Sequence, residues 1–193
     1  MIMANIQQED RLNLAPKKFN MWIFIFTSFM FFAALTSGFI VYSGGKGHGI
    51  HIILPQAFMY STACILLSSV TLFIASKATK RLQFEKQRLY LWFTIALGIL
   101  FFAIQVYAWM QLIAMGVYFV NNNASQTFIY VFTGMHLVHI IAGLLLLANT
   151  LIGSYRNIPQ VKNVFRMEMS SIFWHFIDII WIYLYVFLLL NQY

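Results

Sequence analysis

The chain has 193 residues, of which 61% are hydrophobic, 18% aromatic and only 9% charged, with a formal net charge of +7. Soluble domains carry about 25% charged residues, so this composition excludes an ordinary water-soluble domain. A bilayer is the alternative solvent, and a helix needs about 20 mostly apolar residues to cross it.

Five apolar segments are long enough to span a membrane, and they predict an all-α integral membrane protein. They cover residues 20–43, 56–76, 89–114, 127–151 and 169–190. We expect a single transmembrane domain over residues 20–193, preceded by a tail of residues 1–19 that is too polar for a signal peptide. The three prolines lie outside the spans, where we expect them to interrupt no helix: Pro16, Pro55 and Pro159.

The basic residues are distributed very unevenly between the two sides of such a bundle. All but one of the 12 Lys and Arg fall in the N-terminal tail or in the connections after the second and fourth spans, and the exception is Lys46. Such residues are retained on the cytoplasmic side, which places the N-terminus inside and the C-terminus outside. The charge then serves topology and anionic lipid rather than nucleic acid. Arg81, Arg88 and Arg156 are candidate lipid-binding residues on charge alone.

One carboxylate is placed deep in an apolar segment. Asp178 lies about 13 Å into the last span at 1.5 Å per residue, and His175 precedes it by one turn on the same face. A charged aspartate at the centre of a membrane helix costs about 2.5–3.5 kcal/mol, so we expect it to face protein and to pair. The other four acids lie in tails, connections or span ends: Glu9, Asp10, Glu85 and Glu168.

Two more histidines, His136 and His139, lie in the fourth span. Counted from the inner ends of the two antiparallel spans, His139 is about 18 Å deep, Asp178 about 13 Å and His175 about 9 Å. We therefore expect an interhelical contact between Asp178 and His139, with His175 alongside. The four residues are interpreted as a structural polar cluster. We also expect interhelical hydrogen bonds from single polar residues of the spans: Ser28, Ser68, Ser69, Gln105 and Gln111.

Haem ligation is the alternative interpretation of membrane histidines. The two axial ligands of a haem should share a level, whereas His139 and His175 differ by about 9 Å in depth. In the first external loop, His48 and His51 have too few neighbouring ligands for zinc, so we expect a solvated loop. No familiar catalytic constellation is present, and we expect neither a metal site nor a catalytic residue in this chain.

The last span carries the most specific family signal. FWHFIDIIWIYLYVFLLL, residues 173–190, resembles the final helix of subunit III of the haem-copper respiratory oxidases. Residues 133–143 are similar to the family's T-G-x-H-x-x-H-x-x-x-G helix. Three shorter segments are similar to its M-W-x-F, S-S-x-T and G-x-x-F-x-x-x-Q patterns: residues 21–24, 68–71 and 98–105. The matches run in order along nearly the whole chain, in the five-helix layout of the short bacterial form.

The resemblance implies an accessory subunit of a proton-pumping terminal oxidase in the bacterial cell membrane. It implies that haem and copper lie in partner subunits. It also implies packing against subunit I, with subunit II in the same complex, and phospholipid held in a cleft between the first two helices and the rest. Such a subunit supports proton uptake and durability during turnover. The resemblance does not decide between cytochrome c, which we favour as the donor, and quinol, nor membership of a respiratory supercomplex.

Two positions depart from the family pattern. Ser28 stands where the first helix commonly has a glutamate, and Ala108 where the third helix often has another. We therefore expect this chain neither to conduct protons itself nor to react with carboxylate reagents through its first helix. Two other classes stay open at this point. One is a bis-histidine haem electron carrier, and the other is a transporter, for which several charged residues near the midplane would be expected.

Overall fold

The computed structural model describes residues 2–44, 50, 52–120, 123–156 and 159–192, and of residues 2–13 it describes the backbone only. Lys46 and the histidines of the first loop, His48 and His51, lie outside the described residues. The described part of the chain is helical, without strands. Its helices are α1 (Ile2–Ser43), α2 (Ala57–Lys80), α3 (Phe84–Ala114), α4 (Ala124–Tyr155) and α5 (Gln160–Leu190).

All five helices are long and apolar enough to cross a membrane, which confirms the predicted architecture. At the end of the bundle near the C-terminus, their boundaries agree with the predicted spans to within three residues. At the opposite end each helix continues beyond its predicted span. The reason is that the segments rich in Lys, Arg, Gln and Glu are good helix formers, so a helix does not stop where its apolar part stops.

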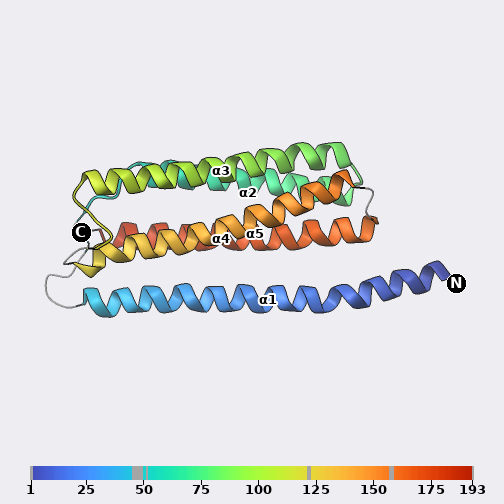
Figure 1. Ribbon diagram of the computed structural model, residues 1–193, viewed down its shortest axis with the longest axis horizontal. Coiled ribbons are helices and arrows are strands. Elements are labelled where there is room, and N and C mark those ends of the chain that lie inside the picture. Colours follow the sequence, from blue (N-terminus) through green and yellow to red (C-terminus); the bar gives the residue numbers. More distant parts are fainter. Residues whose placement is uncertain (1, 45–49, 51, 121–122, 157–158, 193) are drawn as a thin grey trace.

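Helix α1 begins within the N-terminal tail and contains Pro16. The expectation that all prolines lie outside helices is therefore wrong for this residue. In Figure 1 the N-terminal part of α1 turns away from the axis of the remainder. A proline inside a helix removes one backbone hydrogen bond and commonly bends the helix.

The helices α2 to α5 form a four-helix bundle in which each helix packs against two others, and α1 lies against α4 and α5. Figure 1 shows α1 along one side of the molecule, away from α2 and α3, with the two chain termini at opposite ends. Polar pairs join α1 to its neighbours at three levels: Lys18–Glu168, Ser28–His139 and Thr36–Tyr183.

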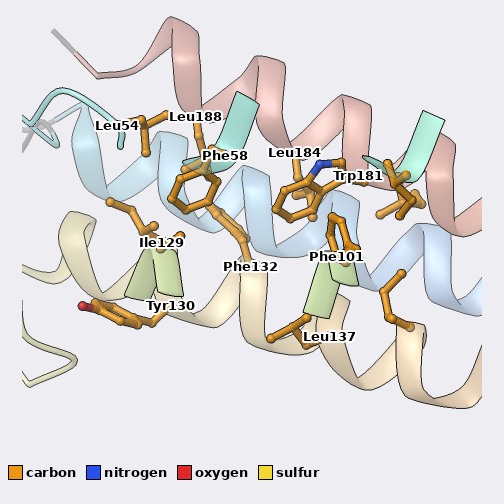
Figure 2. Packing of buried hydrophobic residues seen from close by; sticks show 14 of the residues in the cluster. Leu54, Phe58, Phe101, Ile129, Tyr130, Phe132, Leu137, Trp181, Leu184 and Leu188 are labelled. Atoms are coloured by element: carbon orange, nitrogen blue, oxygen red, sulfur yellow. The ribbon is translucent and has the colours of Figure 1, made fainter. Parts of the chain in front are cut away.

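Aromatic rings fill the centre of the bundle (Figure 2). The Trp181 ring stacks on Phe58 of α2 at a centroid distance of 6.2 Å and meets Phe101 of α3 edge-on at 4.9 Å. His136 of α4 completes the group, with its ring centroid 4.9 Å from that of Trp181. This packing holds α5 at a fixed rotation against three other helices, and so determines where its polar side chains point.

Candidate functional site: a polar seam between helices α2 and α5

Three side-chain hydrogen bonds join the middle of α5 to α2. Trp174 Nε1 donates a hydrogen bond of 3.0 Å to Ser68 Oγ, and Trp181 Nε1 donates one of 3.0 Å to Thr62 Oγ1. A third hydrogen bond, of 2.7 Å, joins Ser69 Oγ to His175 Nδ1. We call this set the α2–α5 seam: Thr62, Ser68, Ser69, Trp174, His175, Asp178 and Trp181.

Asp178 belongs to the seam by position and is nearly enclosed. It lies between Trp174 and Trp181 on the same helical face and is 3% exposed. Its Oδ2 is 3.9 Å from His175 Nδ1. Neither carboxyl oxygen has a partner at hydrogen-bonding geometry within the described residues, although the Ser69 hydroxyl lies nearby. The seam therefore contains a carboxyl group whose hydrogen-bonding capacity is unused.

His139 points away from this seam, towards α1. Its Nδ1 is 2.8 Å from the Met135 carbonyl oxygen, which can only accept, so Nδ1 carries the proton. Its Nε2 is 3.2 Å from Ser28 Oγ, and in a neutral ring that nitrogen accepts the hydroxyl proton. The rings of Phe24 and Phe32 lie beside the imidazole.

The predicted contact between Asp178 and His139 is therefore wrong. The expected depths of the two residues, about 13 and about 18 Å, also differed more than the observed levels do. The α4–α5 contacts of Gly143 with Trp174 and of His136 with Trp181 set the register, and they place Asp178 and His139 at about the same height. The two side chains leave the α4–α5 pair on different sides.

His136 lies in an aromatic enclosure. It is fully buried, with Phe32, Phe101 and Trp181 around it, and neither ring nitrogen has a partner in the described structure. Gln105, one turn along α3 from Phe101, is also fully buried with both amide atoms unpartnered. Interhelical bonds were predicted for five polar residues. They are confirmed for Ser28, Ser68 and Ser69 but not for Gln105 or the Gln111 side-chain oxygen.

Four of the five segments that resemble the oxidase family meet around Trp174. Besides its bond to Ser68, the indole lies against two glycines on other helices. A Cβ added at Gly98 of α3 would lie 2.7 Å from Trp174 Cη2, and one added at Gly143 of α4 would lie 2.9 Å from its Cε3. Trp174 belongs to the segment most specific to the family, but no role was predicted for it, because a tryptophan in an apolar helix resembles ordinary core. Its spacing from Asp178 was the available signal.

The histidines do not converge as haem ligands would. His139 faces α1 and both of its ring nitrogens are engaged, whereas His175 faces α2 and bonds to Ser69. Their separation in depth is smaller than the expected 9 Å, since the observed register reduces it to about three residues, or about 4.5 Å. Direction, rather than depth, separates the two rings. Across the described ranges, no group of three or more His, Cys, Asp and Glu could hold a metal ion.

The candidate lipid-binding arginines lie at the basic end in two separate pockets. Arg88 donates to the Ser154 carbonyl and hydroxyl oxygens, and its guanidinium lies 4.4 Å from the centroid of the Tyr155 ring. With Arg156 it lines a pocket of about 330 Å³. Arg81 lines another, of about 310 Å³, whose other cations are Lys77 and Lys86. The three arginines do not form one site.

These features define a multi-pass helical membrane protein whose intramembrane polar groups mostly join its own helices. Residues 13–192 match the family model described as Cytochrome c oxidase subunit III. The chain belongs to this family, which contributes a subunit to the proton-pumping haem-copper oxidases of aerobic respiration.

Individual relatives come from both cytochrome c and quinol oxidases. Cytochrome c oxidase subunit 3 of Alkalihalophilus pseudofirmus is 23% identical, over 85% of this chain and 81% of the relative. Cytochrome bo(3) ubiquinol oxidase subunit 3 of Pseudomonas putida is 30% identical, over 83% and 79%. The corresponding protein of Buchnera aphidicola is 26% identical, over 97% and 93%. With the five apolar helices, the bacterial relatives identify a multi-pass protein of the bacterial inner membrane.

Proposed function

We propose that this chain is an accessory, non-catalytic subunit of a proton-pumping terminal oxidase. It packs beside subunit I, in a complex that also contains subunit II, while haem and copper reside in those partners. The observation that carries the proposal is the family match over residues 13–192. The direction of the polar side chains supports it, because His139, His175 and Trp174 bond to neighbouring helices of the same chain rather than surrounding a common centre.

Proton transfer then takes place in the partner subunits. Ser28 and Ala108 stand where the family often has glutamates, and neither side chain can ionise. The Ser28 hydroxyl bonds to His139, and Ala108 is fully buried in apolar core. The chain would then support proton uptake indirectly: by packing against subunit I, it would shape the entrance of the proton pathway in that subunit.

We further propose that the chain holds phospholipid. The expected cleft between the first two helices and the rest is not formed by the described residues, because α2 packs against α3 and α5 and not against α1. An apolar pocket of about 590 Å³ lies instead between α1 and the α4–α5 pair, with room for part of an acyl chain. Its lining combines apolar side chains with two asparagines: Asn20, Met21, Phe24, Ala142, Leu145, Leu146, Asn149 and Phe173. At the basic end, Arg81, Arg88 and Arg156 are suited to bind anionic headgroups from the cytoplasmic leaflet.

Cytochrome c is the electron donor that we propose for the complex, in line with the family description and with the Alkalihalophilus relative. Quinol is the second candidate, because a subunit of a ubiquinol oxidase aligns with 97% of the chain. Oxygen consumption by the purified complex with reduced cytochrome c or with ubiquinol distinguishes them.

The test of the accessory role compares the oxidase purified with and without this chain. We expect the depleted complex to keep its haem spectrum and its initial oxygen consumption, and then to lose activity faster during continued turnover. Adding the chain back should restore the lifetime. Loss of all activity at the first turnover would assign the chain a catalytic role, and an unchanged lifetime would remove the accessory role.

A further inference from the structure

The outer edge between α2 and α5 exposes hydrogen-bonding groups where a lipid could not satisfy them. His175 lies close to the midpoint of α5, and 32% of its side chain is exposed. Its Nδ1 is bonded to Ser69, whereas its Nε2 is not enclosed and has no bond to any described residue. Hydrocarbon offers no hydrogen bonds, so such a group is costly on a lipid-facing surface.

The adjoining face of α2 carries small hydroxyl residues at helical spacing. Thr62, Ser69 and Ser76 follow one another at intervals of seven residues, and each is partly exposed. Small residues let another helix approach closely, and hydroxyl groups bond across such contacts. The Thr62 hydroxyl is already bonded to the Phe58 carbonyl oxygen and to Trp181, and that of Ser69 to His175, so the stripe offers small side chains for close approach rather than free hydrogen-bonding groups.

A second, independent observation lies behind this edge. Asp178 is 97% buried and both of its carboxyl oxygens are unpartnered within the described residues, with Oδ2 3.9 Å from His175 Nδ1. An unpaired polar group at this depth destabilises an isolated chain. This edge therefore contains hydrogen-bonding groups that the described residues of the chain do not satisfy.

The outer face of α3 offers a contrast. Its exposed residues at comparable depth are apolar, including Trp92, Phe93, Ile99 and Leu100, as expected for a surface that meets acyl chains. On α1, the exposed Thr27 donates its hydroxyl to the Phe24 carbonyl oxygen, and the exposed Ser37 lies six residues before the helix ends at Ser43.

We propose that the α2–α5 edge is the face on which a transmembrane helix of the oxidase's catalytic subunit packs. That helix presents a polar side chain, such as a serine, threonine or asparagine, which bonds to His175 Nε2. The assignment rests on the proposed function and adds to it the contact surface. Lipid at this edge, and contact through α3 or α1, are the alternative outcomes of the test.

Photocrosslinking in native membranes tests the surface. A photoreactive residue at Ile179, 64% exposed one turn beyond His175, or at Leu66, 45% exposed on α2, should crosslink to the catalytic subunit. The matched control is Ile99, which is 57% exposed on α3 and should crosslink to lipid. Crosslinks to the catalytic subunit from Ile99 but not from Ile179 or Leu66 would overturn the assignment, as would lipid adducts alone at the edge in a chain that still co-purifies with the oxidase.

A paired measurement on Asp178→Leu separates docking from folding. The variant chain, purified alone, should have a melting temperature equal to or above that of the unaltered chain. The amount of catalytic subunit that co-purifies with it should fall. Ser37→Leu, at an exposed site on α1, is the control and should change neither quantity. A lower melting temperature with unchanged co-purification would make the carboxyl a folding element and overturn the inference. Failure of the unaltered chain to recover any catalytic subunit would instead contradict the proposed function, and the edge assignment with it.

Discussion

At the scale of single residues, the molecule depends on a few positions where side-chain size or hydrogen-bonding capacity is fixed by a neighbouring helix. Trp174 is the clearest, since it is fully buried, bonded to α2 and in contact with glycines of α3 and α4. Ser28 is another, because its hydroxyl serves the imidazole of His139. Neither role is visible in a hydropathy profile, since both depend on which helix lies opposite.

Gly143→Ala should destabilise the protein. The new Cβ would lie 2.9 Å from Trp174 Cε3 and 3.0 Å from Ile177 Cδ1, and overpacking of this kind costs about 1–3 kcal/mol. Gly134→Ala on the same helix is the control, because its Cβ would meet Trp109 at an ordinary 3.8 Å. Thermal unfolding in detergent should show a lower midpoint for the first variant only. Equal midpoints would mean that the indole is free to move.

Ser28→Glu should make α1 reactive towards a hydrophobic carbodiimide. The described part of α1 has no carboxyl group within residues 20–43, and the new one would lie beside His139. Peptide mapping after labelling should find the reagent on this segment in the variant and not in the unaltered chain. Labelling of residues 20–43 in the unaltered chain would contradict the expectation that α1 does not react with carboxylate reagents.

At the scale of helices, the existence of the five spans followed from composition and length, but the rotation of each helix did not. A soluble helix shows its buried face through alternating apolar and polar residues, whereas a membrane helix is apolar nearly all round. Polar residues then indicate that a face meets protein without indicating which neighbour it meets. Depth alone placed Asp178 nearer to the level of His139 than His175 is, but the packing around Trp174 and Trp181 turns the carboxyl towards α2.

Ser68→Ala should loosen the attachment of α5 to α2. The substitution leaves the buried Trp174 N–H without an acceptor, and interhelical bonds of this type contribute about 0.6 kcal/mol on average in membranes. Ser61→Ala on the same helix is the control. That serine is equally buried, but it donates only to its own helix, at the Phe58 carbonyl oxygen.

Hydrogen exchange of the α2 and α5 backbone amides, followed by mass spectrometry, measures this effect. Exchange should accelerate near Ser68 and Trp174 in the first variant and stay unchanged in the control. The same acceleration in both variants would show that loss of a hydroxyl, rather than loss of the interhelical bond, is responsible.

At the scale of the whole molecule, charge and hydropathy were sufficient to predict a five-helix membrane bundle, and the motif resemblance was sufficient to predict the family. The contacts of individual side chains could be determined only from the positions of the helices in space. The unused polar groups of His136, Gln105 and Asp178 are apparent only once every neighbour is placed. The α2–α5 edge, where intramembrane polarity reaches the surface, likewise depends on how two helices far apart in sequence lie side by side.

The orientation of the bundle is testable by labelling. With the basic end in the cytoplasm, a cysteine at the exposed Lys80 should react with a membrane-impermeant maleimide only after the inner membrane is permeabilised. A cysteine at the exposed Gln56, at the opposite end, should react in intact spheroplasts. The native Cys64 is buried and provides little background. The reverse pattern would invert the topology.

The central claim is that the polar groups within the membrane fasten helices of this chain and of its oxidase partner, and hold no redox centre. Purification of the tagged chain in mild detergent, followed by separation of its companions and absorption spectroscopy of each, tests this directly. The account predicts that the catalytic subunit co-purifies and that the haem spectrum remains with it after separation, leaving the isolated chain without a Soret band. A Soret band belonging to the isolated chain, or recovery of the chain without any oxidase core, would contradict it.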